Sequence, residues 1–370
     1  WISPGSSFRF GFYNNPGGYL VGVLFHTSGM PTTAAWSAVL PPKSVGPSAS
    51  FRLASDGNLI LTNGSSASDT LIWSSGTAGL RVASAAMRDD GNFVLQDTDG
   101  KVVWQTFDRP TDTLLQNQTL RAGMSLSAGL AGGGGPQYLA TMEVSGNLTL
   151  TYVTDNETFW SSGTASGNGS YASLRVEAGN IALAVYTGAG AKLPEVWYPN
   201  DYTRSATINQ EIIRRVTLGG DGNLRIYSWA VGEATSVWSV GWQAVADQCL
   251  VPGFCGPNGI CSYNMTGIVC GCAASAGFSF IDPSEPRLGC SAPSDNNGGS
   301  CSSGTATMVP LNNTQLFLPT AKSLRYDDST CHSNCLNNDL CTAATALNDG
   351  SGMCLSLNDN QRNFSGYQEL

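Results

Sequence analysis

Histidine and charged side chains are scarce in this sequence. Only two histidines occur, His26 and His332, and charged residues make up 12% of the 370 residues. Because the two histidines lie far apart and in different predicted domains, a serine or cysteine nucleophile activated by histidine is not expected. The formal net charge is −9, and no basic cluster is larger than Arg214–Arg215. This argues against a nucleic-acid partner, which requires a cationic face.

Other features that catalysis or membrane insertion requires are missing as well. No apolar run is long enough to span a bilayer, and the chain opens at Trp1 without a signal peptide, which predicts a processed or trimmed ectodomain. The run Gly132–Gly135 lacks the Lys-Ser/Thr of a phosphate-binding loop. Adjacent acids such as Asp89 and Asp90 would point to opposite sides of a strand, so they are poor acid/base pairs. We therefore predict no catalytic residue, no metal site and no cofactor in this chain.

Cysteine is absent from the first 248 residues, and all eleven cysteines follow. Their irregular spacing and the shortage of histidine favour a disulfide framework over a zinc site, and hence an oxidising, extracellular setting. Asn-x-Ser/Thr sequons support secretion, because they are acceptors for N-linked glycans. The eight predicted glycosylation sites are Asn63, Asn117, Asn147, Asn156, Asn168, Asn264, Asn312 and Asn363.

Glycine is abundant, with 44 residues, and it takes part in an internal repeat. Five times, a Gly-Asn turn is followed by a short strand and then by a tryptophan. Gly-Asn supplies the positive φ of a hairpin turn, the strand packs one face, and the tryptophan fills a shared core. A single copy cannot bury its apolar face, so the copies must assemble around an axis. The turns start at Asp56, Asp90, Ser145, Ala178 and Asp221, and the tryptophans are Trp73, Trp104, Trp160, Trp197 and Trp238.

The phrase Trp104-Gln-Thr-Phe-Asp-Arg-Pro-Thr-Asp-Thr-Leu-Leu115 follows the second copy. Its Asp-x-Pro and Thr-Asp-Thr segments can bond their own backbone, which predicts a rigid corner. This segment closely resembles the W-Q-S-F-D-x-P-T-D-T-L-L signature of the plant bulb-lectin (G-type) S-domain receptor kinases. Ser3–Phe12 is likewise similar to the family's S-P-N-G-x-F-x-L-G-F. The resemblance implies a mainly β chain with two tandem β-prism II domains, each with three four-stranded sheets. One of the six copies would then be too degenerate to recognise.

The resemblance also orders the domains along the chain. It implies a bulb-type lectin domain over residues 1–115 and a second, lectin-like domain, the S-locus glycoprotein region, over 116–246. A disulfide-rich EGF-like module over 247–291 follows, because Gly256-Pro-Asn-Gly259 and Cys270-Gly-Cys272 are similar to those of this module. The last domain, over 292–370, resembles an α+β PAN/apple domain that is truncated at its end.

Cysteine pairing follows from the same resemblance, since spacing alone leaves it open. Cys331 and Cys335 are four apart and would share one face of a helix. Cys301 is left over, either as a free thiol or, as we prefer, with a partner beyond Leu370. The implied disulfides are Cys249–Cys261, Cys255–Cys270, Cys272–Cys290, Cys331–Cys354 and Cys335–Cys341.

Three copies of the repeat are candidate sugar sites. The family's mannose motif is Q-x-D-x-N-x-V-x-Y, in which alternate residues of one strand bind sugar hydroxyls. The first two copies keep Asp and Asn but lose Gln and Tyr, and the fifth has Gly219 for Gln and Arg225 for Val. The candidate ligand-binding residues are Asp56, Asn58, Asp90, Asn92, Asp221, Asn223 and Tyr227. We favour the alternative that Asp-Gly-Asn persists because it forms the turn, so that mannose binding is weak or absent.

The resemblance implies a receptor function. We expect the ligand-sensing ectodomain of a plasma-membrane receptor-like Ser/Thr kinase, in immune or self/non-self signalling through ligand-linked dimerisation. A transmembrane helix and a kinase using ATP and Mg would lie beyond Leu370, so this chain itself is no enzyme. The partners would be an unknown peptide, lipid or glycan and a homodimer or co-receptor. The alternatives are a secreted or wall-associated lectin and a kinase-less co-receptor or decoy.

Overall fold

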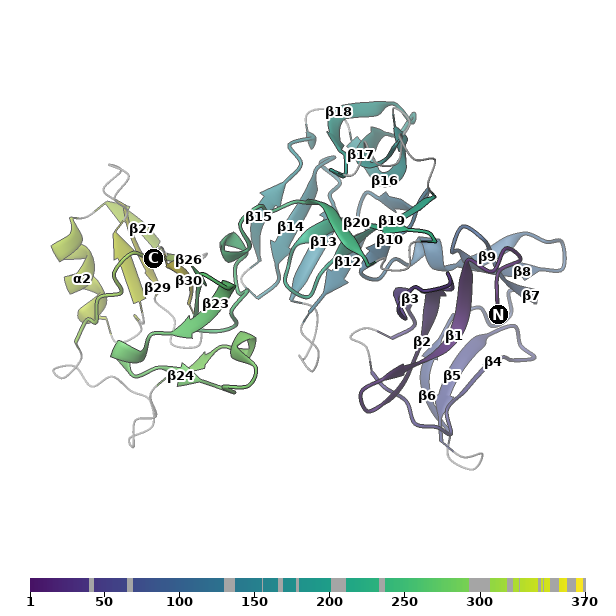
Figure 1. Ribbon diagram of the computed structural model, residues 1–370, viewed down its shortest axis with the longest axis horizontal. Helices are drawn as coiled ribbons and strands as arrows, with labels where there is room; N and C mark the ends of the chain where they lie inside the picture. Colours follow the sequence, from purple (N-terminus) through teal and green to yellow (C-terminus); the bar gives the residue numbers. More distant parts are fainter. Residues whose placement is uncertain are drawn as a thin grey trace. The chain divides into compact units, whose positions relative to one another are not determined.

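The structure is a computed structural model of the chain. It describes residues 1–39, 43–64, 69–129, 137–154, 156–165, 169–177, 180–200, 211–232, 237–292, 307–317, 322–325, 327–338, 341, 343–346, 353–357 and 364–368. The chain divides into two compact units, residues 1–153 with 160–244 and residues 154–159 with 245–370. Both consist mainly of strands, so the expected mainly β class is confirmed (Figure 1).

The first unit begins with three antiparallel sheets around a common core, which we call the first β body. Its strands alternate buried and more exposed residues, as in β5, where Leu59 and Leu61 are buried. Gly57 and Gly91 close two of the turns with φ of +85° and +86°. The sheets are β1 (Phe8–Asn15), β2 (Gly18–Phe25) and β3 (Ala34–Ser37); β4 (Ser50–Leu53), β5 (Leu59–Asn63) and β6 (Thr70–Ser74); and β7 (Val82–Met87), β8 (Phe93–Asp97) and β9 (Val102–Gln105), followed by η1 (Thr106–Asp108).

Each sheet of the first β body contributes one tryptophan to the centre. Trp36, Trp73 and Trp104 come from β3, β6 and β9, and their ring centroids lie 5.9, 6.0 and 5.8 Å apart. The copy that the sequence pattern did not reveal is therefore β1–β3. Its hairpin turns through Pro16-Gly17 instead of Gly-Asn, which hides it from the repeat.

The second β body completes the first unit with three four-stranded sheets. The strands β10, β11 and β12 are the edge strands of three different sheets, and they follow one another closely in the sequence. Thr113-Leu114, Thr119-Leu120 and Ser125-Leu126 recur at regular intervals, and the three leucines are buried. The strands are β10 (Thr113–Leu114), β19 (Ile212–Leu218), β20 (Leu224–Ala230) and β21 (Ser239–Gln243); β11 (Thr119–Arg121), β16 (Gly169–Glu177), β17 (Asn180–Thr187) and β18 (Lys192–Trp197); and β12 (Ser125–Ala128), β13 (Tyr138–Met142), β14 (Leu148–Tyr152) and β15 (Glu157–Ser161).

The tryptophan expected from the last copy of the repeat is a different one. Trp242, together with Trp160 and Trp197, forms the central cluster, with centroids 6.2, 5.6 and 5.7 Å apart. The assignment of Trp238 to this place is wrong. In the ladder Trp242 lies opposite Ile226, as Trp104 lies opposite Leu95, so the pairing register selects it.

The sheet membership also bears on how the first unit is divided. The second β body already begins at Thr113, just before the predicted boundary at residue 115, because β10 pairs with β19. The first β body has three-stranded sheets among the described residues, whereas the resemblance implied four strands in each.

The second unit is small and rich in disulfides. Within the described residues, five disulfides join the same pairs that the family resemblance implied, Cys249–Cys261, Cys255–Cys270, Cys272–Cys290, Cys331–Cys354 and Cys335–Cys341. The elements are η3 (Gln248–Leu250), β22 (Gly259–Asn264), β23 (Gly267–Cys272), η4 (Ala274–Ala276), β24 (Ser279–Phe280), η5 (Pro286–Leu288), β25 (Cys290–Ser291), β26 (Thr314–Phe317), β27 (Lys322–Arg325), α2 (Asp328–Leu336), β28 (Ala343–Ala346), β29 (Met353–Leu357) and β30 (Ser365–Gln368).

One sheet of this unit combines strands from both of the predicted modules. Its order is β23-β22-β30-β26, and β22 pairs in parallel with β30. Asn258 joins the same two segments, because its backbone N–H donates to the Phe364 carbonyl and its Oδ1 accepts from the Phe364 N–H. The boundary near residue 291 therefore separates two stretches of sequence that share one sheet.

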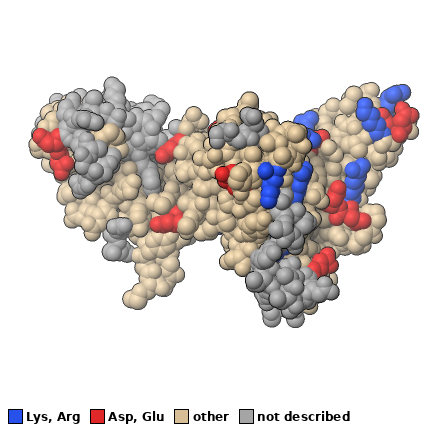
Figure 2. Space-filling model, turned by 90° about the horizontal axis from the view of Figure 1, so that it is seen from above, with Lys and Arg blue, Asp and Glu red and all other residues tan. Residues whose placement is uncertain are grey.

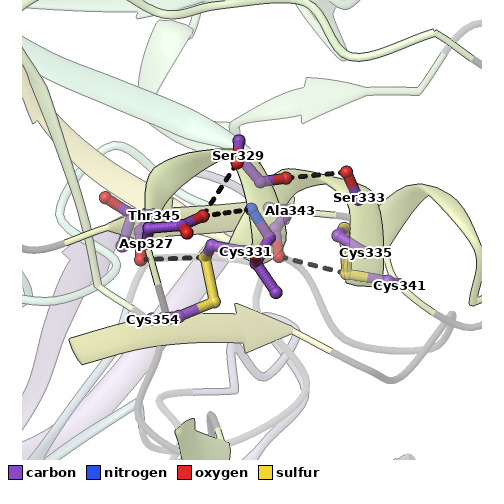
Figure 3. The surroundings of a disulfide bond; sticks show 10 residues. Asp327, Ser329, Cys331, Ser333, Cys335, Cys341, Ala343, Thr345 and Cys354 are labelled. Atoms are coloured by element: carbon purple, nitrogen blue, oxygen red, sulfur yellow. Dashed lines mark hydrogen bonds between the residues drawn. A yellow bond between two sulfur atoms is a disulfide. The ribbon is translucent and has the colours of Figure 1, made fainter. Parts of the chain in front are cut away.

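The helix α2 carries the two cysteines that were expected on one face. Asp327 caps its start by accepting from the Thr330 N–H at 2.7 Å. Cys331 and Cys335 are both buried, and Figure 3 shows the Cys331–Cys354 disulfide joining the helix to β29. Cys301, Asn168, Asn363, Ala178 and the glycine run 132–135 lie outside the described residues.

The described part of the chain contains no helix with the length and hydrophobicity of a membrane span. Within the same residues, no three His, Cys, Asp or Glu side chains cluster in a way that could hold a metal ion.

Candidate functional site

The aspartates of the three candidate copies each stabilise their own turn. Asp56 Oδ1 accepts from the Asn58 N–H at 2.9 Å, and Asp90 Oδ1 accepts from the Asn92 N–H at the same distance. Asp221 Oδ1 accepts from the Asn223 N–H at 3.3 Å. Such bonds across two residues define an Asx turn. Part of the hydrogen-bonding capacity of each carboxylate is therefore used within its own turn.

The asparagine side chain joins the turn to the end of the neighbouring strand. Asn58 Oδ1 accepts from Ser75 Oγ and from the Gly76 N–H, both at 3.0 Å. Asn92 Oδ1 accepts from Thr106 Oγ1 and from the Phe107 N–H, both at 3.2 Å. The amide oxygen of each asparagine is thus already bonded inside the protein.

The hydroxyl residue two positions after the tryptophan completes this arrangement. Ser75 follows Trp73 and Thr106 follows Trp104, and in the copy at Asn147 the hydroxyl is that of Ser162, which donates to Asn147 Oδ1 at 2.9 Å. Each hydroxyl also accepts the N–H of the residue after the asparagine. The sequence signal for this role, Trp-x-Ser/Thr, is present but was not recognised.

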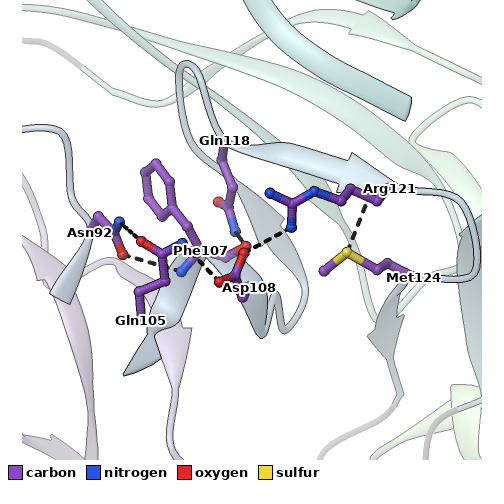
Figure 4. Close-up of polar contacts among 7 residues, drawn as sticks. All are labelled: Asn92, Gln105, Phe107, Asp108, Gln118, Arg121 and Met124. Carbon is purple, nitrogen blue, oxygen red and sulfur yellow. Dashed lines mark hydrogen bonds and ion pairs between the residues drawn. The ribbon is translucent and has the colours of Figure 1, made fainter. Parts of the chain in front are cut away.

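The turn at Asp90 has further polar neighbours (Figure 4). Asn92 Nδ2 donates to Gln105 Oε1 at 2.9 Å, and Gln105 Nε2 donates to Asp108 Oδ2 at 2.8 Å. Arg121 pairs with the other oxygen of Asp108 at 2.9 Å. Gln105 and Asp108 belong to the signature that carries the family resemblance, yet they were not predicted as site residues. Their position indicates that the signature supports the turn that bears Asp90.

The turn at Asp221 has a different electrostatic character. Arg225 Nη2 lies 2.7 Å from Asp221 Oδ2. Partial burial lowers the pKa of Arg225, but the hydrogen bond and charge of Asp221 outweigh it and raise that pKa above its usual value. A side chain at Gly219 would collide with the Asp221 carboxylate. A glutamine at this position would therefore require that carboxylate to shift.

Tyr227, the remaining candidate, is also engaged. The guanidinium of Arg215 lies 4.6 Å from the centroid of the Tyr227 ring and 4.6 Å from that of Trp238. Such cation–π stacking holds the phenol against the body of the protein. Trp238 in turn contacts Phe25, and its Nε1 donates to Thr33 Oγ1 at 3.0 Å, which explains why it is not in the central cluster.

The candidate residues therefore do not form one site. Asp56, Asp90 and Asp221 lie beside three different sheets. The carboxylates of Asp56 and Asp90 are in exposed residues and can still accept hydroxyls, whereas that of Asp221 is paired. On the face in Figure 2, basic and acidic side chains lie among a larger area that carries neither.

Comparison with known proteins adds two domain matches. Residues 41–129 match the D-mannose binding lectin family, and residues 197–280 match the S-locus glycoprotein domain. Two G-type lectin S-receptor-like serine/threonine-protein kinases of Arabidopsis thaliana are 37% and 34% identical, over 100% of this chain in both cases. The matched regions are 42% and 47% of those proteins, so the chain spans less than half of their length.

Two solved lectins show weaker similarity. One is a Japanese Marasmius oreades lectin, with a TM-score of 0.26 and 18% identity over 36% of this chain and 89% of that protein. The other is a two-domain, fetuin-binding agglutinin of Scilla campanulata, with a TM-score of 0.24 and 21% identity over 52% of this chain and 88% of that protein.

Proposed function

The chain belongs to the family of plant G-type lectin S-receptor-like serine/threonine-protein kinases, and we propose that it is the extracellular, ligand-sensing region of such a receptor. The observation that carries this proposal is the match to two members of the family over the whole chain. The five disulfides among the described residues support it, because disulfides form and persist mainly in oxidising compartments. On this proposal the chain binds and the kinase lies elsewhere in the protein.

The ligand that we propose is a peptide, a lipid or a complex glycan instead of simple mannose. Recognition of a monosaccharide needs several converging donors and acceptors. In this chain Asn58 and Asn92 bond the protein itself, and Asp221 is neutralised by Arg225. Each missing hydrogen bond would weaken sugar binding by about 1 kcal/mol.

A glycan array with the purified, glycosylated chain tests this part of the proposal. A mannose-binding bulb lectin serves as the positive control, and Asp90→Ala and Asp221→Ala serve as variants. We expect no mannose signal from the wild type. A clear signal that Asp90→Ala or Asp221→Ala abolishes would overturn our view of the turns and favour a secreted or wall-associated lectin.

Signalling through dimerisation, in immunity or in self/non-self recognition, is the further step that we propose. A bivalent antibody against this chain, applied to cells with the full-length receptor, should raise phosphorylation of its kinase. The monovalent fragment of the same antibody should not. Equal responses to both reagents would contradict dimerisation, and a full-length reading frame without a kinase would favour a co-receptor or decoy.

A further inference from the structure

Two sequons within the described residues differ sharply in their surroundings. Asn264-Met265-Thr266 forms the tip of the hairpin between β22 and β23, and all three residues are exposed. In Asn147-Leu148-Thr149, Leu148 is 1% exposed and Thr149 is 3% exposed. We propose that Asn264 carries an N-linked glycan in the folded protein and that Asn147 does not.

The geometry at Asn264 suits the acceptor amide of a glycan. Asn264 Oδ1 accepts from the Thr266 N–H at 2.8 Å and from Thr266 Oγ1 at 2.7 Å. Both contacts use the oxygen, and the residue is exposed at the tip of its hairpin. In the transfer step, Nδ2 bonds to the anomeric carbon of an oligosaccharide that is carried on a lipid diphosphate. The bond from that carbon to the diphosphate oxygen breaks, the lipid diphosphate leaves, and Nδ2 loses one proton to a base of the transferase.

The sequon at Asn147 is part of the internal turn structure. Its Oδ1 accepts from Ser162 Oγ at 2.9 Å and from the Thr164 N–H at 3.0 Å, and both partners are buried. The Thr149 hydroxyl donates to the Thr141 carbonyl and to Glu143. Thr149, the hydroxyl residue of this sequon, is held inside the folded second β body. We therefore expect the transferase to have no access to the sequon once that body has folded.

A glycan at Asn264 would also cover Met265, the next residue at the tip of the hairpin, which is 105% exposed. Tyr263 and Ile268, which pair across the hairpin, project from the opposite face of the strands to Asn264. An uncovered apolar side chain at such a tip can contact a second molecule. We therefore expect the chain without this glycan to self-associate more than the glycosylated chain does.

The test is a site-by-site measurement on the full chain secreted from plant cells. Enzymatic release of the glycans in heavy-oxygen water converts each modified asparagine to a labelled aspartate, which peptide mass spectrometry identifies. We expect the label at Asn264 and none at Asn147. Label at Asn147 in the secreted chain, or an unmodified Asn264, would overturn the proposal.

A matched pair of variants separates the glycan from the hairpin itself. Thr266→Ser keeps the sequon and should keep the label, whereas Thr266→Ala should lose it and show increased light scattering at the same concentration. Equal scattering from the two variants would contradict the covering role. The inference rests on the proposed passage through the secretory pathway. A secreted chain with no label at any sequon would count against that passage. Label at other sequons but not at Asn264 would count against the assignment of Asn264 alone.

Discussion

Arg225 and Asp221 form an ion pair across the turn that begins β20, with 2.7 Å between Nη2 and Oδ2. The two side chains are only 12% and 21% exposed. Both departures of this copy from the sugar motif are linked to the pair, since Arg225 replaces valine and Gly219 leaves space for the Asp221 carboxylate. The carboxylate that would bind sugar stabilises the protein instead.

The first prediction concerns the strength of this pair. Arg225→Ala should lower the free energy of unfolding by about 2 kcal/mol, because it leaves a partly buried carboxylate without its partner. The matched control is Arg121→Ala, whose pair with Asp108 has side chains 61% and 44% exposed. That variant should lose less than about 1 kcal/mol. Urea unfolding measures the loss of stability in both variants. Equal losses would show that the burial of the Asp221 pair adds nothing to its contribution to stability.

The second prediction concerns pH and Asp112. Burial raises the pKa of Asp112 above its usual 3.8, and this outweighs the bond with Thr113 and the charge of Arg215, which lower it. The folded state therefore holds the proton more tightly than the unfolded chain. Protonated Asp112 therefore stabilises the folded state, and this stabilisation is lost as the pH rises from about 3.8 through the raised pKa.

Asp112→Asn removes this dependence, so it should be more stable than the wild type near neutral pH, with an advantage that shrinks toward about pH 4. Urea unfolding at several pH values checks the slope. A constant difference between the two proteins at every pH would contradict the assignment to Asp112.

The third prediction distinguishes two tryptophans. Trp242→Ala should cost about 3–5 kcal/mol, because it empties the central cluster of the second β body. Trp238→Ala should cost less, since Trp238 lies outside that cluster, although both tryptophans are half-buried. Trp242→Phe retains most of the ring and should be intermediate. A larger loss for Trp238→Ala than for Trp242→Ala would restore the assignment that the repeat suggested.

The fourth prediction compares two disulfides of the second unit. Cys331–Cys354 closes a separation of 23 residues and Cys335–Cys341 one of 6. Loop-closure entropy predicts losses of about 3.4 and about 2.2 kcal/mol when each pair is replaced by serine. The double variant Cys331→Ser/Cys354→Ser should therefore be secreted at a lower level than Cys335→Ser/Cys341→Ser. The reverse order would show that the tie between α2 and β29 contributes little.

Local chemistry allowed much of the fold to be predicted from the sequence. Gly-Asn turns, short alternating strands and a returning tryptophan depend on neighbouring residues, so four of the five predicted tryptophans lie in the central clusters. The family resemblance supplied the disulfide pairs, which spacing could not. The roles of Gln105 and Asp108 could also have been predicted, since both residues belong to the signature.

Contacts between distant residues determined the remainder. The ladder register placed Trp242 opposite Ile226, and a parallel pairing of β22 with β30 joined two predicted modules in one sheet. The roles of the sugar-motif residues were the hardest to predict, because the same residue types serve whether they face a ligand or the protein. Asn92 bonds Thr106, 14 residues further along the chain, only because the folded backbone brings these groups within hydrogen-bond distance.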